Sequence, residues 1–168
     1  MRAHRINAYQ AAPAAMKALV AVETYLHQTT LGPLLIELVK MRASQINGCA
    51  YCLDAHSKEL RKNGETEQRI YLLNAWRESP LYSPRERAAL AWTEALTLIS
   101  ETNAPDDVYD EVARHFDAKE VVDLTTLIGM INCGTAWRSA YATSTRPADA
   151  SPAPGPARLP ARGPPTRQ

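Results

Sequence analysis

The sequence of 168 residues has no apolar run long enough to cross a membrane and no excess of charge of either sign. A membrane-spanning helix needs about 20 consecutive apolar residues, and the apolar stretch near the N-terminus is interrupted by Lys17 and Glu23, unlike the core of a signal peptide. With 19 basic and 18 acidic residues, the chain offers no concentrated positive field to a phosphate backbone. We therefore expect a cytoplasmic protein that binds neither membrane nor nucleic acid.

The strand-like alternation of apolar and polar residues is almost absent, and no internal repeat is visible. Helix signals recur instead, since "SPRE" at 83–86 and "DAKE" at 117–120 are capping-box patterns, and Gly48 and Gly64 are suited to helix ends. The sequence therefore predicts an all-α bundle of about seven helices. The expected helices cover 14–28, 33–48, 49–63, 66–78, 84–100 and 105–116, followed by a long one from 117.

The composition indicates a single folded domain followed by a tail. The apolar fraction of 45% in 168 residues is enough for one sizeable core. From residue 146 onward, Pro, Ala, Arg and Gly dominate, aromatic residues are absent, and Leu159 is the one large aliphatic side chain. Such a segment cannot offset its ordering entropy by burial. We expect a domain over residues 1–145 and a disordered tail over 146–168.

Cysteine is scarce, and two of the three cysteines lie together in "INGCAYCLDAH", residues 46–56. In a helix beginning near Cys49, the Cα atoms of Cys49 and Cys52 would be about 5 Å apart, within the range that a disulfide tolerates. His56 follows one turn later on the same stripe. A nearby imidazole and the helix dipole favour the nucleophilic thiolate. The spacing is therefore typical of reversible dithiol chemistry.

Two other interpretations of these cysteines remain open. A structural zinc ion takes four ligands, whereas Cys49, Cys52 and His56 provide three, and no second Cys-x-x-Cys or histidine pair follows. Cys133 is either a remote fourth ligand or a small buried hydrophobe. Cys49 and Cys52 can also be inert core residues. We expect no bound metal or cofactor, and keep a non-enzymatic redox or zinc-binding module as an alternative.

Glu37 lies on the shoulder of the apolar stripe of the helix expected over 33–48. Burial there would disfavour the charged form of the carboxylate and let it act as a base near neutral pH. The alternative is that Glu37 faces solvent and pairs with Lys40 or Arg42.

The remaining aromatic and titratable side chains are expected to be structural. We interpret the tryptophans as core or oligomer contacts, and the histidines outside the motif as surface or capping residues. The tryptophans are Trp76, Trp92 and Trp137, and the histidines are His4, His27 and His115.

The stretch "LLIELVKMRASQINGCAYCLDAHSKELRKNGETEQRI", residues 34–70, resembles the core of the carboxymuconolactone decarboxylase family, in particular its alkylhydroperoxidase D-like (AhpD-like) branch. The shared signature is a glutamate twelve residues before the first cysteine of a Cys-x-x-Cys pair, and a histidine four residues after the second. Glu37, Cys49, Cys52 and His56 fill these positions. The segment 73–99 is also similar to members of this branch, so the likeness covers roughly residues 5–132.

This resemblance implies an all-helical fold that assembles into trimers or hexamers, and a peroxidase that reduces hydrogen peroxide or organic hydroperoxides with an external thiol or dithiol reductant. Cys52 would attack the peroxide and Cys49 would then form a disulfide with it, with Glu37 and His56 as the proton relay. The helix dipole alone favours ionisation of Cys49 instead. Tyr51 stands where the best-known peroxidase members have a second histidine. A lactone decarboxylase is the alternative within the family, although the lactone branch does not rely on a redox dithiol.

Overall fold

The computed structural model describes residues 6–141 and is all-helical over that range, with no strand. The predicted all-α class is confirmed. The described part contains nine α-helices and one 3₁₀ turn, rather than about seven helices. The helices are α1 (Ala8–Ala11), α2 (Pro13–Leu26), α3 (Pro33–Asn47), α4 (Ala50–Lys62), α5 (Glu67–Leu72), α6 (Pro84–Thr97), α7 (Ile99–Thr102), α8 (Asp106–His115) and α9 (Ala118–Tyr141), with the 3₁₀ turn η1 at Leu73–Ala75.

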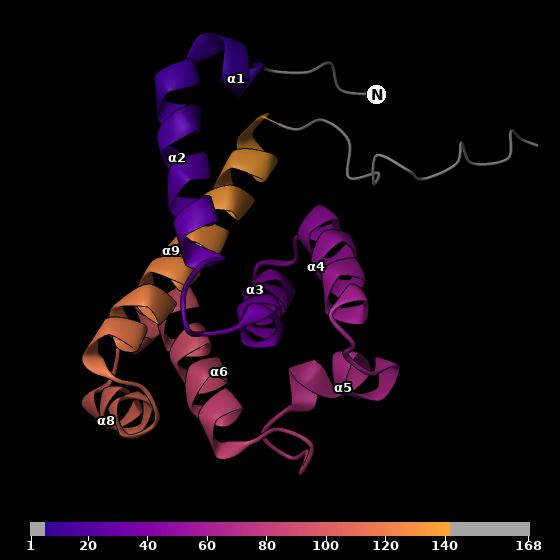
Figure 1. Cartoon of the computed structure of the whole chain (residues 1–168), viewed down its shortest axis with the longest axis vertical. Helices are drawn as coiled ribbons and strands as arrows, with labels where there is room; N and C mark the ends of the chain where they lie inside the picture. The colour runs from indigo at the N-terminus through magenta and orange to yellow at the C-terminus, as the bar shows by residue number, and fades with distance from the viewer. Residues whose placement is uncertain (1–5, 142–168) are drawn as a thin grey trace, which may run out of the picture.

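Helix α3 lies at the centre of the bundle and packs against α4, α6 and α9 (Figure 1). One of its sides carries Leu35, Ile36 and Val39 into a core shared with α6, α8 and α9. Another side carries Leu38 and Met41 into a second core with α4, α5 and α6. Because two sides of α3 are used for apolar packing, its third side is free to hold polar groups inside the fold.

Local capping signals fix several helix ends as the sequence predicts. Ser83 and Glu86 form a reciprocal capping box at the start of α6. At the start of α9, the amide of Glu120 donates to Asp117 Oδ1 at 2.8 Å and the amide of Asp117 donates to Glu120 Oε2 at 3.2 Å. Each reciprocal pair satisfies two backbone N–H groups that the first helical turn leaves without partners.

The helix predicted over 66–78 is shorter in the structure. It ends as α5 and continues through η1 into a turn. The guanidinium of Arg87 on α6 donates to the carbonyls of Trp76 at 2.8 Å and Ser79 at 3.1 Å. These tertiary hydrogen bonds hold the segment in a turn, a preference that local sequence signals do not contain.

Within residues 6–141, no helix is long and apolar enough to span a membrane. The tail predicted over 146–168, and His4, lie outside the described residues.

Candidate redox-active site

A tight turn between α3 and α4 sets the position of the first cysteine. Gly48 adopts a left-handed conformation with φ of 63° and ends α3, and the amide of Cys49 donates to the carbonyl of Ser44 at 3.1 Å. This is the hydrogen bond of a glycine C-cap, which satisfies a carbonyl of the last helical turn while reversing the chain. The turn therefore places Cys49 at the N-cap of α4, against the end of α3.

Cys49 and Cys52 form a disulfide bond, with their Cα atoms 5.3 Å apart. Both side chains are buried. Cys49 Sγ also accepts a hydrogen bond from the amide of Cys52 at 3.3 Å, as an N-cap side chain does. Cys52 Sγ lies 3.8 Å from the hydroxyl of Thr135 on α9. The two sulfurs thus have different polar neighbours, a backbone amide for Cys49 and a hydroxyl for Cys52.

His56 and Glu37 form a hydrogen-bonded pair between α4 and α3. His56 Nδ1 lies 2.8 Å from Glu37 Oε2, and the side chains are 16% and 6% exposed. Glu37 is therefore buried, and of the two alternatives the one in which it faces solvent is wrong. Arg42, named as its partner in that interpretation, pairs instead with Glu94 on α6 at 2.9 Å. A carboxylate held to one ring nitrogen fixes the orientation of the imidazole and the position of its proton.

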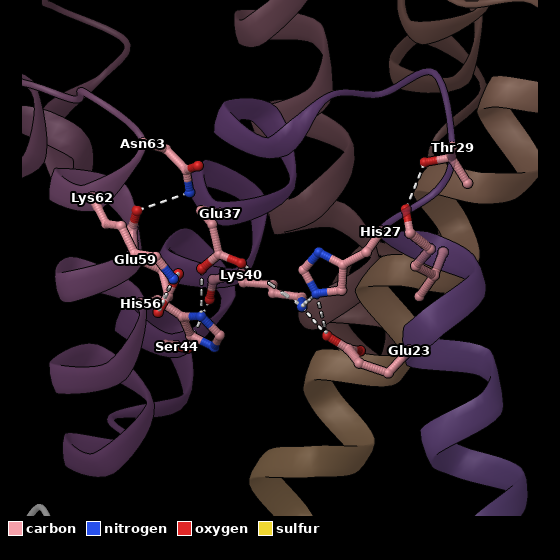
Figure 2. Close-up of polar contacts among 11 residues, drawn as sticks. Glu23, His27, Thr29, Glu37, Lys40, Ser44, His56, Glu59, Lys62 and Asn63 are labelled. Carbon is pink, nitrogen blue, oxygen red and sulfur yellow. Dashed lines mark hydrogen bonds and ion pairs between the residues drawn. The ribbon is translucent and has the colours of Figure 1, made fainter.

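A second set of charges continues from Glu37 toward the surface (Figure 2). Lys40 Nζ lies 3.9 Å from Glu37 Oε1, forms a short ion pair with Glu23 on α2, and lies 3.4 Å from His27 Nε2. Burial alone would raise the pKa of Glu23, but the hydrogen bond and charge of Lys40, together with His27, outweigh it and lower that pKa. Glu37, Lys40 and Ser44 are all buried and share one side of α3. The third side of α3 is thus a buried polar stripe that ends beside the disulfide.

The polar groups around the motif include several that the sequence does not reveal. Thr135 and Glu23 come from α9 and α2, outside the motif, and no local pattern marks them. His27, expected at the surface, is half-exposed but belongs to this chain of contacts. Tyr51 does not join the His56–Glu37 pair in the structure, and its ring lies under the guanidinium of Arg138, with the guanidinium carbon 3.4 Å from the ring centroid.

The tryptophans and Cys133 occupy different settings. Trp76 and Trp92 are buried, as expected for core residues. Trp137 and Cys133 instead line a cavity between α2 and α9 that His56 also borders. Cys133 is neither disulfide-bonded nor fully buried. Over residues 6–141, no group of three or more Cys, His, Asp or Glu side chains is arranged to hold a metal ion.

The chain is similar in sequence and fold to several known proteins. The profile of the carboxymuconolactone decarboxylase family matches residues 13–95. The uncharacterized protein YdfG of Bacillus subtilis is 46% identical over 128 residues, which cover 76% of this chain and 87% of YdfG. A crystal structure of a protein of unknown function from Agrobacterium tumefaciens, described as a candidate antioxidant defence protein AhpD, is 44% identical with a TM-score of 0.79, over 84% of this chain and 97% of that one. The alkyl hydroperoxide reductase AhpD of Hyphomonas neptunium is 56% identical over 34 residues, 20% of this chain and 19% of that protein.

The chain belongs to the carboxymuconolactone decarboxylase family. Within this family it is similar to proteins of the AhpD-like branch.

Proposed function

We propose that this protein is a thiol-dependent peroxidase that reduces hydrogen peroxide or organic hydroperoxides through its Cys49–Cys52 pair. The observation that carries this proposal is a disulfide at the start of α4, on the helix whose His56 is hydrogen-bonded to the buried Glu37. Reversible bridging needs two sulfurs within bonding reach, and peroxide attack needs a thiolate with a proton donor close to the leaving oxygen. The relative named alkyl hydroperoxide reductase supports the same chemistry.

The reaction balances in three steps. The Cys52 thiolate attacks the terminal oxygen of the peroxide, the O–O bond breaks, and the alkoxide or hydroxide leaves with a proton, so that Cys52 becomes a sulfenic acid. The Cys49 thiol then attacks the sulfenic sulfur, which forms the disulfide and releases water. An external thiol or dithiol reductant gives two electrons and two protons to the disulfide and restores both thiols.

The residues around the sulfurs have distinct roles in this scheme. His56 would take the proton of the attacking thiol and return it to the leaving oxygen, while Glu37 orients the ring. The amide of Cys52 donates to Cys49 Sγ and stabilises negative charge there. This hydrogen bond suits Cys49 as the thiol that is displaced when the reductant attacks the disulfide, since a stabilised thiolate leaves faster.

We propose the cellular location, assembly and reductant of the protein from its resemblance to the family. The protein would act in the cytoplasm as a homo-oligomer, a trimer or a hexamer, and would be reset by a thiol or dithiol reductant protein. Size-exclusion chromatography with light scattering tests the assembly.

Thiol counting tests the reaction itself. Fully reduced protein is mixed with a small excess of hydroperoxide, and free thiols and consumed peroxide are measured for the wild type, Cys52→Ser and Cys49→Ser. We expect the wild type to lose about two thiols per chain, Cys52→Ser to consume no peroxide, and Cys49→Ser to consume peroxide once and stop as a sulfenic acid. An unchanged rate in Cys52→Ser would show that Cys52 is not the attacking thiol.

A further inference from the structure

A cavity of about 690 Å³ lies between α2 and α9, and His56 is part of its wall. Most of the wall is apolar, with Met16 and Leu19 from α2 and Met130 and Trp137 from α9. Cavities of this size and character are typical of small-molecule sites. Hydrogen peroxide would leave most of this space unfilled, whereas an apolar chain or ring would match it.

The charges on the cavity wall are uneven. Lys40 and Glu23 both border the cavity, but they form an ion pair with each other. His56 is held by Glu37. Arg138 also borders the cavity, and it forms no ion pair with any residue in the described range 6–141. Within the described residues, the positive charge of Arg138 is therefore the one on the wall without an ion-pair partner.

Tyr51 holds the guanidinium of Arg138 at this place. The guanidinium carbon lies 3.4 Å from the centroid of the Tyr51 ring. A guanidinium stacked on an aromatic face keeps its N–H groups pointing outward in its own plane, free to donate. Two parallel N–H groups of this kind match the two oxygens of a carboxylate. Arg138 is thus an anchored, exposed cation at the edge of an apolar cavity.

We propose that this cavity binds an anionic amphiphile, with its apolar chain or ring inside and its carboxylate paired with Arg138. His56, which follows Cys52 by one turn on α4, borders the cavity, so a ligand held here contacts the helix that carries the dithiol. If the peroxidase activity proposed above is correct, the substrates are hydroperoxides of this class. Binding itself does not depend on that activity and can be measured without a peroxide.

The test compares two ligands of equal chain length that differ in charge. Dodecanoate and dodecanol are titrated into the full chain, and tryptophan fluorescence is followed because Trp137 lines the cavity. We expect saturable binding of dodecanoate, and Arg138→Gln should weaken it about tenfold or more while dodecanol binding stays the same. Arg138→Lys keeps the charge but not the planar guanidinium, so its affinity for dodecanoate should lie between those of the wild type and Arg138→Gln. Arg114→Gln, at an exposed arginine of α8, is the matched control and should bind both ligands as the wild type does.

A second variant tests the cavity rather than the charge. Val20 borders the cavity and is half-exposed, so Val20→Phe fills part of the cavity without disturbing the core. It should weaken the binding of both dodecanoate and dodecanol. The proposal is overturned if wild-type protein shows no saturable dodecanoate binding, or if Arg138→Gln binds dodecanoate as tightly as the wild type. Arg138-dependent binding in a protein that consumes no peroxide would uphold this site and contradict the proposed peroxidase.

Discussion

Lys40 Nζ lies 3.9 Å from Glu37 Oε1, and both side chains are almost fully buried. Lys40 is therefore a cation beside the carboxylate that holds His56. The Glu37 carboxylate accepts a hydrogen bond from His56 Nδ1, which leaves Nε2 as the ring nitrogen that can act as a base. We therefore expect Lys40 to act on His56 through Glu37, since none of the contacts that Lys40 makes within residues 6–141 reaches either sulfur.

The first prediction concerns this lysine as a positioning residue. Lys40→Met leaves Glu23 and Glu37 without their shared cation, which should lower the free energy of unfolding by about 3 kcal/mol. It should also reduce the rate of peroxide consumption about tenfold and shift its pH dependence. Urea unfolding and a pH–rate profile measure the two effects.

Lys40→Arg keeps the charge and is the control, with a rate and profile close to those of the wild type. A Lys40→Met protein that is folded and has the wild-type profile would show that Lys40 stabilises the fold alone.

The second prediction is that His56 and Glu37 act as one unit. His56→Gln should reduce the peroxide rate about 100-fold, and Glu37→Gln should have a similar effect because it can no longer fix the imidazole proton. The double variant should then be little worse than either single one. Stopped-flow measurement of the peroxide reaction with reduced protein gives the three rates.

His115→Gln is the matched control, because His115 also pairs with a glutamate, Glu111, at 3.1 Å, but on α8. Its rate should equal that of the wild type. Multiplicative effects of His56→Gln and Glu37→Gln would contradict a shared role.

The parts of this site that the sequence predicts are the ones encoded locally. Glu37, Cys49, Cys52 and His56 belong to two consecutive helices whose ends are marked by Pro33, Gly48 and Gly64. Motif spacing and helix geometry therefore bring Cys49 to Cys52 and Glu37 to His56. Thr135 and Glu23 reach the site through the packing of α9 and α2, which no spacing rule contains.

The prediction of one helix over 66–78 is wrong for a related reason, since the guanidinium of Arg87 on α6 donates to the carbonyl of Trp76 and, just beyond that range, to the carbonyl of Ser79. Both cases depend on tertiary contacts rather than on local sequence signals.

The third prediction concerns stability in acid. Burial would raise the pKa of Glu94, but hydrogen bonds from Trp76 and Arg77 and the charge of Arg42 outweigh it, so that pKa lies below the ordinary value of 4.5. The stabilisation that the ionised carboxylate gives is complete above pH 4.5 and disappears as the pH falls through its lower value in the folded protein. Glu94→Gln should lower the free energy of unfolding by about 1–3 kcal/mol near neutral pH, and much less in acid.

Urea unfolding of the wild type and Glu94→Gln, near neutral pH and in acid, measures this difference. Glu101→Gln, at an exposed carboxylate of α7, should change little at either pH. A penalty for Glu94→Gln that stays constant down to acid pH would mean that the charge of Glu94 is not its source.

The last prediction tests the turn that positions Cys49. Gly48 has a φ of 63°, where a side chain strains the backbone even though no atom would contact an added Cβ. Gly48→Ala should therefore cost about 1–2 kcal/mol of unfolding free energy. Gly129, in the middle of α9, also has open space around an added Cβ but has helical geometry, so Gly129→Ala should stabilise by roughly 0.5–1 kcal/mol. The opposite signs separate backbone strain from steric crowding.

The same turn forms the hydrogen bond from the Cys49 amide to the Ser44 carbonyl and so positions Cys49. Gly48→Ala should therefore also slow disulfide formation after peroxide addition, whereas Gly129→Ala should not. Equal bridging rates in the two variants would show that the turn is needed for stability but not for the alignment of the sulfurs.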